Sequence, residues 1–242
     1  MARGDLRTIL AMLRGPGSAA SHAGRMEALY RSQADGYDRF RERFLLGRDE
    51  LVLHLAPPPG STVVEMGGGT GRNLERFGDA LESFRAVHLV DLSRPLLEVA
   101  RERRRRLGWR NVEIVEGDAT SWRPPGGEPV DRIYFSYSLT MIPDWFRAAD
   151  NALAILRPGG LLGAVDFHIS RKRPAPGRAR HGMLARLFWA AWFGRDDVFP
   201  SPDILPYLEA RTEPVHLAER RGRIPYLPFL RPPYFVFIGR KS

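Results

Sequence analysis

The hydrophobic positions of this chain fall into short runs that alternate with stretches of helical spacing. Apolar runs of strand length lie at residues 62–66, 86–91, 112–115, 130–137, 160–167 and 234–239. Helical spacing lies between them, over about 71–82, 94–107 and 144–156. Near-continuous apolar strands separated by helices are typical of a parallel sheet covered on both faces. The pattern therefore predicts a doubly wound α/β domain, although it does not give the strand order.

The two ends of the chain follow other patterns. Residues 1–24 combine a short amphipathic set with a stretch rich in glycine, proline and serine, which predicts a leader or surface helix followed by a linker. Residues 25–56 carry helical spacing up to a run of prolines, and we expect them to form an N-terminal helical cover. We expect one domain over residues 25–242, in which residues 170–233 form an insertion after the fifth strand.

Composition narrows the possible chemistry. The 242 residues, 43% of them hydrophobic, suffice for one large core. The absence of cysteine excludes a disulfide framework, a thiolate metal site and a cysteine nucleophile. The six histidines show no close pair at metal-ligand spacing, so we predict no metal.

The formal net charge of +9 comes from arginine, because Lys172 and Lys241 are the only lysines. Such an excess attracts nucleic acid, anionic lipid or acidic small molecules, and net charge alone does not distinguish them. No apolar run approaches the roughly 20 residues that a membrane-spanning helix needs. The N-terminal apolar set is interrupted by Arg7 and Arg14, which argues against a signal peptide, so we expect a cytoplasmic location.

A glycine turn with two flanking carboxylates is the most informative motif. The run Glu65-Met66-Gly67-Gly68-Gly69-Thr70-Gly71 ends the first predicted strand, where ligands of such sheets bind. Asp91 ends the second strand, where a carboxylate can accept both hydroxyls of a ribose. A dinucleotide fingerprint would need glycine at position 72 or 74, which hold Arg72 and Leu74. These residues argue against NAD.

The motif resembles that of the class I S-adenosylmethionine (SAM)-dependent methyltransferases, E/D-x-G-x-G-x-G, over roughly residues 50–168. The resemblance implies a Rossmann-like, mostly parallel sheet of seven strands. It implies that Gly67, Gly69 and Gly71 surround the amino acid part of SAM and that Asp91 binds the ribose. The remaining SAM-binding residues that we predict are Arg48, Glu65, Asn73, Leu92, Asp118, Ala119 and Ser136. Asp118, Ala119 and Leu92 would adjoin the adenine, although Asp118 could instead be a helix cap or turn residue.

Further segments resemble the N-methyltransferases of betaine-lipid synthesis. They are Phe44–Asp49, Gly69–Asn73, Phe135–Trp145 and Pro233–Lys241. The resemblance implies successive methylation of diacylglyceryl-homoserine to diacylglyceryl-trimethylhomoserine. The chain departs from the commoner motif at Met66 and Gly68, which alters packing near SAM.

A segment in the predicted insertion fits a lipid substrate. Residues 183–193 are apolar and aromatic, and they follow a basic stretch that contains Arg171, Lys172, Arg173, Arg178 and Arg180. Aromatic residues beside basic ones are typical of a segment at an anionic membrane surface. A buried helix behind a solvated basic loop is the alternative. The same basic residues could follow an RNA backbone, but no RNA-binding module accompanies them, so we expect no nucleic acid partner.

Methylation of an amine requires a neutral nitrogen opposite the methyl group, and no covalent residue is needed. Asp166 and His168 follow the fifth strand and are candidates to assist proton loss, although His168 could also be a structural histidine. A quaternary ammonium is best bound by aromatic faces, for which Tyr30, Tyr37 and Tyr137 are candidates. Arg48 could hold a carboxylate of SAM or of the headgroup through a bidentate pair.

Three interpretations remain open from sequence. We favour a lipid-headgroup N-methyltransferase, peripheral on the cytoplasmic membrane. The second is a SAM-dependent methyltransferase of phosphatidylethanolamine or of a soluble small molecule. The third is a non-catalytic nucleotide-binding or RNA-binding protein, because a fold alone does not define a function.

Overall fold

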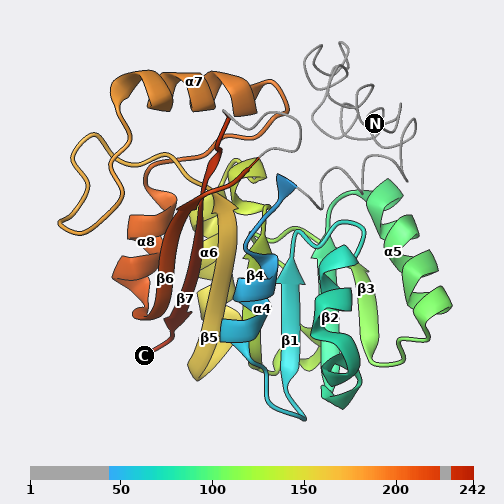
Figure 1. The fold of residues 1–242 in the computed structure, drawn as a ribbon. Coiled ribbons are helices and arrows are strands. Elements are labelled where there is room, and N and C mark those ends of the chain that lie inside the picture. The colour runs from blue at the N-terminus through green and yellow to red at the C-terminus, as the bar shows by residue number, and fades with distance from the viewer. Residues whose placement is uncertain (1–43, 224–229) are drawn as a thin grey trace.

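The computed structural model describes residues 44–223 and 230–242, which form a seven-stranded sheet with helices on both faces (Figure 1). The strands are β1 Thr62–Met66, β2 Ala86–Asp91, β3 Val112–Glu116, β4 Val130–Ser136, β5 Leu156–Phe167, β6 Glu213–Arg221 and β7 Pro233–Arg240. Their order is β3-β2-β1-β4-β5-β7-β6. Strands β1 to β5 are parallel, whereas β7 is antiparallel to both of its neighbours. The expected Rossmann-like fold class is confirmed.

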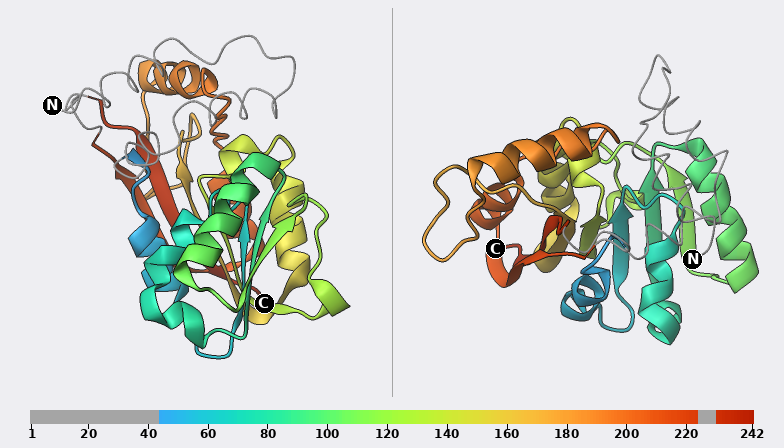
Figure 2. Two further views of the ribbon diagram at one scale, coloured as in Figure 1. Left: turned by 90° about the vertical axis from the view of Figure 1, so that its right-hand side faces the viewer. Right: turned by 45° about the horizontal axis from the view of Figure 1, so that its top comes forward.

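The sheet separates two apolar cores because its side chains alternate between faces. On β1, for example, Val63 packs into one core and Val64 into the other. The helices are α4 Arg48–Leu55, η1 Arg72–Ser83, α5 Arg94–Leu107, α6 Trp145–Ile155, α7 Met183–Gly194 and α8 Ile204–Arg211. Helices α4, η1 and α5 cover the first core, and α6 and α8 cover the second (Figure 2). Two short 3-10 turns, η2 Pro125–Gly127 and η3 Leu139–Met141, complete the described elements.

Helix α5 illustrates why these segments are helical. Leu96, Leu97 and Ala100 recur at helical spacing and are buried against the sheet. Gly108 ends the helix in the left-handed conformation, with φ of 69°, and its N–H closes the last turn. Three arginines in that last turn suit the negative end of the helix dipole.

Most predicted elements lie within a few residues of the observed ones, and the differences are local. The helix expected over about 71–82 is the 3-10 helix η1, interrupted at Gly78, which has non-helical dihedral angles. Strand β5 begins at Leu156, inside the predicted helix 144–156, because Leu156 already pairs with Val130 of β4. The segment 170–233 contains β6, which belongs to the sheet, so an insertion does not fill this segment.

Of the expected N-terminal cover over 25–56, the structure describes the end, which includes α4. The predicted leader 1–24 lies outside the described residues. In the described parts of the chain, no helix is both long and apolar enough to cross a membrane.

Candidate functional site

A cavity of about 650 Å³ opens at the carboxyl ends of β1, β2 and β4. This is the edge at which the strand order reverses, between β1 and β4, and ligands of doubly wound sheets bind there. The cavity wall comes from the glycine turn after β1, the ends of β2, β3 and β4, and the first residue of α4. Its size suits a nucleotide-sized ligand.

The glycine turn presents bare backbone to the cavity. Gly67 and Gly69 have positive φ angles of 70° and 54°, and the amides of Gly67 and Gly68 both donate to the carbonyl oxygen of Val90. A Cβ on Gly67 would lie 2.5 Å from the Cβ of Ser138. A Cβ on Gly68 would lie 2.6 Å from the Cγ of Leu89. The close approach of Ser138 and Leu89 therefore requires glycine at positions 67 and 68, and the missing side chains leave main-chain atoms accessible to a ligand.

Asp91 joins the turn to the second strand. Its Oδ2 accepts a hydrogen bond of 2.8 Å from the Gly69 amide, and its Oδ1 accepts one of 2.8 Å from the Ser93 amide. Burial raises the pKa of the Asp91 carboxyl, although both hydrogen bonds oppose that shift. Each carboxylate oxygen has a further lone pair, so Asp91 can also accept hydroxyl groups of a sugar from the cavity.

The far wall of the cavity has an apolar rim. Leu92 is 66% exposed although it is a large apolar side chain, and it lines the cavity together with Asp118 and Ala119. Asp118 accepts a 2.8 Å hydrogen bond from the Thr120 amide, which fixes the loop after β3. Asn151 of α6 donates to the Ala119 carbonyl oxygen and so supports the same loop. A flat ring between Leu92 and this loop would cover the exposed leucine.

Glu65 lies behind the glycine turn and does not line the cavity. Its carboxylate is fully buried and accepts a 2.6 Å hydrogen bond from the Nδ2 of Asn73, a residue that does line the cavity. Burial raises the pKa of the Glu65 carboxyl to about 7, against the opposing effects of Asn73 and Arg48. Glu65 therefore supports the turn from below, and it holds Asn73, a residue of the cavity wall, in place.

An arginine and an aromatic ring meet at the opposite side of the cavity. The guanidinium carbon of Arg48 lies 5.7 Å from the ring centroid of Tyr137, within the range of a cation–π contact. Tyr137 follows the last residue of β4, Ser136, and both line the cavity. The φ angle of Tyr137 is 54°, a rare conformation for a bulky residue. Its hydroxyl donates to the Leu46 carbonyl oxygen at 2.7 Å, so the tyrosine offers ring surface to the site.

The structure does not bring His168 or Asp166 to the cavity. His168 forms a 2.9 Å ion pair with Glu219 of β6, and its amide donates to the Pro233 carbonyl oxygen. Asp166 is fully buried and accepts a 2.7 Å hydrogen bond from the hydroxyl of Thr140. Burial raises the pKa of Asp166 to about 6. Both residues hold neighbouring segments together, so the geometry does not support the predicted role in proton transfer.

Among the other predicted site residues, Gly71 lies beyond the cavity wall, where a Cβ would meet Leu89. Tyr30 and Tyr37 lie outside the described residues. The predicted segments Phe44–Asp49, Gly69–Asn73 and Phe135–Trp145 all contribute to the wall. The sequence reasoning did not single out several further wall residues, which are Ser93, Leu96, Thr120, Ser121 and Arg147. Most of them adjoin a recognised motif, and their proximity to it was the available signal.

The strand order and the place of this cavity are those of the Rossmann-like methyltransferase fold. Residues 63–160 match the family model described as a methyltransferase domain. The chain is 28% identical over 151 residues to a demethylmenaquinone methyltransferase of Clavibacter sepedonicus, which covers 60% of this chain and 58% of that protein. It is also 28% identical over 153 residues to a trans-aconitate 2-methyltransferase of Paracidovorax citrulli, over 63% of this chain and 56% of that protein. The chain thus spans less than two thirds of both relatives.

Solved structures agree on the fold. The N-methyltransferase NodS of Bradyrhizobium japonicum has a TM-score of 0.57 at 17% identity and covers 86% of this chain and 98% of its own. The [4+2]-cyclase SpnF has a TM-score of 0.61 at 15% identity, over 98% of this chain and 93% of its own. A methyltransferase and a cyclase share this architecture, so the fold does not define the reaction.

Proposed function

We propose that this protein transfers methyl groups from SAM to the amine of a lipid headgroup, that of diacylglyceryl-homoserine, to give the trimethylated betaine lipid. The observation that carries the lipid part of the proposal is an exposed apolar face on α7. Met183 and Leu184 are 71% and 79% exposed, and Leu187 and Phe188 continue the same surface one turn later. A soluble helix would ordinarily bury such a face, and one that stays exposed beside basic residues suits a membrane surface.

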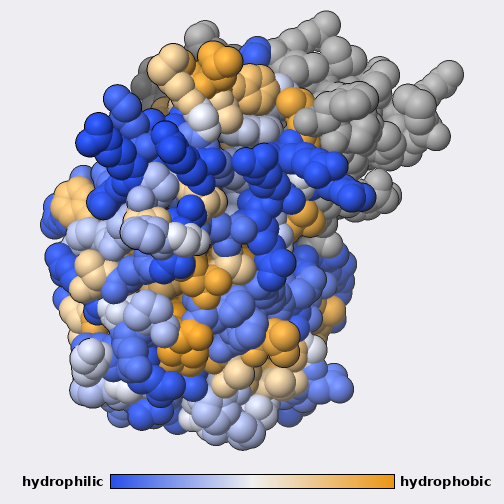
Figure 3. Space-filling view, turned by 60° about the vertical axis from the view of Figure 1, so that its left-hand side comes forward, coloured by the Kyte–Doolittle hydropathy of each residue, from blue (hydrophilic) through white to orange (hydrophobic). Residues whose placement is uncertain are grey.

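The basic residues beside α7 complete this surface. Arg171 and Arg178 are engaged with Asp203 and Glu209. The other exposed cations of the loop are Lys172, Arg173 and Arg180, and among the described residues no ion pair engages them. Figure 3 shows hydrophobic side chains gathered at the top of the molecule, next to a broad hydrophilic band. Cations of this kind attract anionic headgroups by about 1 kcal/mol each near a membrane surface.

A chain of aromatic rings connects α7 to the cavity. The ring of Phe193 on α7 stacks on that of Phe167 with centroids 4.2 Å apart, and Phe167 contacts Tyr137 at 4.8 Å. Figure 1 draws α7 at the end of the sheet toward which β1 and β4 point, the end that carries the cavity. A lipid held at α7 would therefore have its headgroup on the cavity side of the molecule.

The residues of the cavity fit SAM. The carboxylate of Asp91 and the bare backbone of Gly67 and Gly69 suit a ribose and an amino acid group, and Leu92 suits an adenine face. When bound, SAM supplies a methyl group on a positively charged sulfur that is already activated for transfer. The protein then has to orient the amine and exclude water.

Two features of the cavity serve the amine. The Tyr137 ring can accept the cationic ammonium product through its face. Asp91, Asp118 and Asp144 are carboxylates of the cavity wall, and the first two accept main-chain hydrogen bonds. The Asp144 carboxylate has a long ion pair of 3.9 Å with Arg147 and is our candidate to take the proton that the amine loses before each transfer.

A quinone is the second candidate acceptor. The relatives of this chain include demethylmenaquinone and ubiquinone/menaquinone methyltransferases, at 25–31% identity. This alternative requires methyl transfer to carbon, and the same cavity would serve it.

The test incubates purified protein and labelled SAM with diacylglyceryl-homoserine in mixed micelles and follows mono-, di- and trimethylated products by mass. Phosphatidylethanolamine, a demethylmenaquinone and a soluble amino acid are the comparisons. Stepwise methylation of the homoserine lipid alone supports the proposal. Methylation of the quinone instead, or of no lipid while SAM still binds, overturns the proposed substrate.

A matched pair of variants tests the α7 surface. Leu184→Asp places a charge on the exposed face, whereas Leu107→Asp places one on an exposed leucine of α5. We expect only Leu184→Asp to lower co-sedimentation with anionic vesicles, with SAM affinity unchanged in both. Equal vesicle binding by both variants and the unmodified protein would exclude α7 as the contact.

A further inference from the structure

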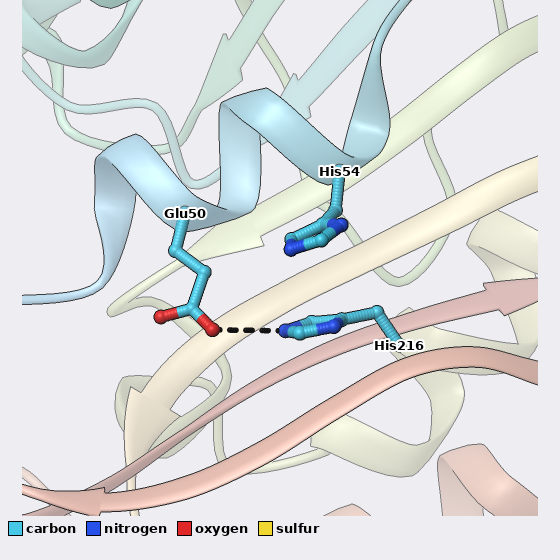
Figure 4. Close-up of side chains that lie close together, drawn as sticks. All are labelled: Glu50, His54 and His216. Carbon is cyan, nitrogen blue, oxygen red and sulfur yellow. Dashed lines mark hydrogen bonds and ion pairs between the residues drawn. The ribbon is translucent and has the colours of Figure 1, made fainter.

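Three side chains converge on the surface between α4 and the edge strand β6. Glu50 and His54 lie four residues apart on α4 and therefore share one face of that helix. His216 reaches them from β6 (Figure 4). The potential ligand atoms of the three side chains all lie within 4.8 Å of one another.

The two imidazole rings lie against each other, and one of them also contacts the carboxylate. The imidazoles of His54 and His216 are stacked, with centroids 3.7 Å apart and planes 13° from parallel. A ring nitrogen of His216 lies 2.9 Å from the Oε1 of Glu50. Figure 4 shows a nitrogen of each ring on the side that faces the Glu50 carboxylate. Three donor atoms thus approach one small volume from two elements.

We propose that Glu50, His54 and His216 bind a divalent transition-metal ion, of which Zn²⁺ fits the donor set best. Two imidazoles and one carboxylate form a common set of protein ligands for Zn²⁺, and three ligands leave a coordination position for water. Mg²⁺ and Ca²⁺ prefer sets made of oxygen donors, so this cluster disfavours them. His54 is exposed and the other two side chains are partly exposed, so an ion can enter from solvent.

One neighbour competes with the ion. The Nη2 of Arg220 donates to the Oε1 of Glu50 at 2.8 Å, and its positive charge opposes a cation. The side chain of Arg220 is 51% exposed, so it can swing into solvent when a metal binds. Removal of the Arg220 charge should therefore strengthen metal binding. If the cluster were only a structural ion pair, removal of this charge would not create stronger metal binding.

The site would connect distant parts of the chain. Glu50 and His216 are 166 positions apart, and α4 also carries Arg48 of the cavity wall. A bound ion would fasten α4 to β6 and stabilise the folded state in proportion to the logarithm of its free concentration. The proposal does not depend on the identity of the methyl acceptor.

The experiment uses untagged, chelator-treated full chain and measures Zn²⁺ binding by competition with a chromophoric chelator. We expect one equivalent to bind, and we expect His54→Ala and His216→Ala to weaken that binding by about 10- to 100-fold or more, since loss of an outer-shell partner alone costs that much. Arg220→Gln should strengthen it. His88→Gln, which alters a histidine on β2 that pairs with Glu113, should leave it unchanged.

Two further readouts separate binding from folding. The visible spectrum of Co²⁺ bound in place of Zn²⁺ reports the number and geometry of the ligands. In thermal unfolding, Zn²⁺ should raise the melting temperature of the unmodified protein but not that of His216→Ala. Unchanged SAM affinity shows that the variants fold. Absence of Zn²⁺ binding by the unmodified protein, or equal binding by the His54, His216 and His88 variants, overturns the proposal.

Discussion

Replacement of Glu65 by glutamine tests the electrostatics beneath the glycine turn. The carboxyl is fully buried, and burial raises its pKa from an ordinary value of 4.5 to about 7. Each tenfold change in proton affinity corresponds to about 1.36 kcal/mol, so ionisation in the folded state costs about 3 kcal/mol. Glutamine has the same shape, stays neutral, and retains an oxygen that can accept the hydrogen bond from Asn73.

The sign of the effect follows from proton linkage. Below pH 4.5 the carboxyl is protonated in both states, and its full contribution to stability is present. As the pH rises toward 7, the unfolded chain releases the proton before the folded protein does, so the free energy of unfolding falls. Above about pH 7 both states are ionised, and the loss is complete. Glu65→Gln removes this loss.

Urea unfolding followed by circular dichroism over pH 4.5 to about pH 8 measures the effect. We expect Glu65→Gln and the unmodified protein to have similar free energies of unfolding at the acidic end. At the alkaline end the variant should be more stable by up to about 3 kcal/mol. Glu82→Gln, on the exposed end of η1, is the matched control. A difference between Glu65→Gln and the unmodified protein that does not vary with pH would refute the reasoning and indicate a carboxylate that is ionised throughout.

Three further predictions concern the site and its surroundings. Asp91→Asn should raise the SAM dissociation constant, measured by calorimetry, about 10- to 100-fold. The asparagine side chain has one acceptor oxygen, so it cannot accept hydrogen bonds from Gly69 and Ser93 and also from a ribose. Unchanged affinity in folded Asp91→Asn and Asp91→Ala would refute the placement of SAM. Gly68→Ala should lower the free energy of unfolding by about 1–3 kcal/mol, because its Cβ would lie 2.6 Å from the Leu89 Cγ, and a second change, Leu89→Ala, should relieve part of that clash. His168→Gln should lower the melting temperature, through the lost ion pair with Glu219, and leave SAM affinity within about twofold, since His168 lies outside the cavity.

The strands that are buried on both faces of the sheet were predicted well from the sequence. Val63, Val64 and Leu89 belong to strands with apolar neighbours on each side, so a continuous apolar run was sufficient signal. Strand β6 escaped prediction because it is an edge strand with partly exposed, charged side chains such as Glu219 and Arg220. Strand β6 pairs with β7 along one edge, and its other edge lies at the border of the described sheet. Fewer of its side chains are therefore buried, and its hydrophobic pattern is weak.

The site residues could be predicted where a sequence motif directly follows a strand. They could not be predicted where their position depends on contacts with distant parts of the chain. Gly67, Gly69 and Asp91 follow directly from strand ends, and the structure brings them to one cavity. His168 follows a strand end too, but β5 is separated from the glycine turn by β4, and the side chain is bound by Glu219. No spacing in the sequence could show that pairing, nor the approach of His216 to Glu50 from 166 positions away.

The position of β7 has a consequence for the order in which the molecule assembles during synthesis. Strand β7 follows β6 along the chain but lies between β5 and β6, and within the described sheet β6 has β7 as its sole neighbour. Strand β6 ends at Arg221 and β7 begins at Pro233, so β6 is synthesised before the strand with which it pairs. Strand β6 can join the sheet only after β7 has paired with β5, so the links from β6 to Glu50 and His168 form late in folding. Whenever β7 detaches, both edges of β6 are open to intermolecular pairing.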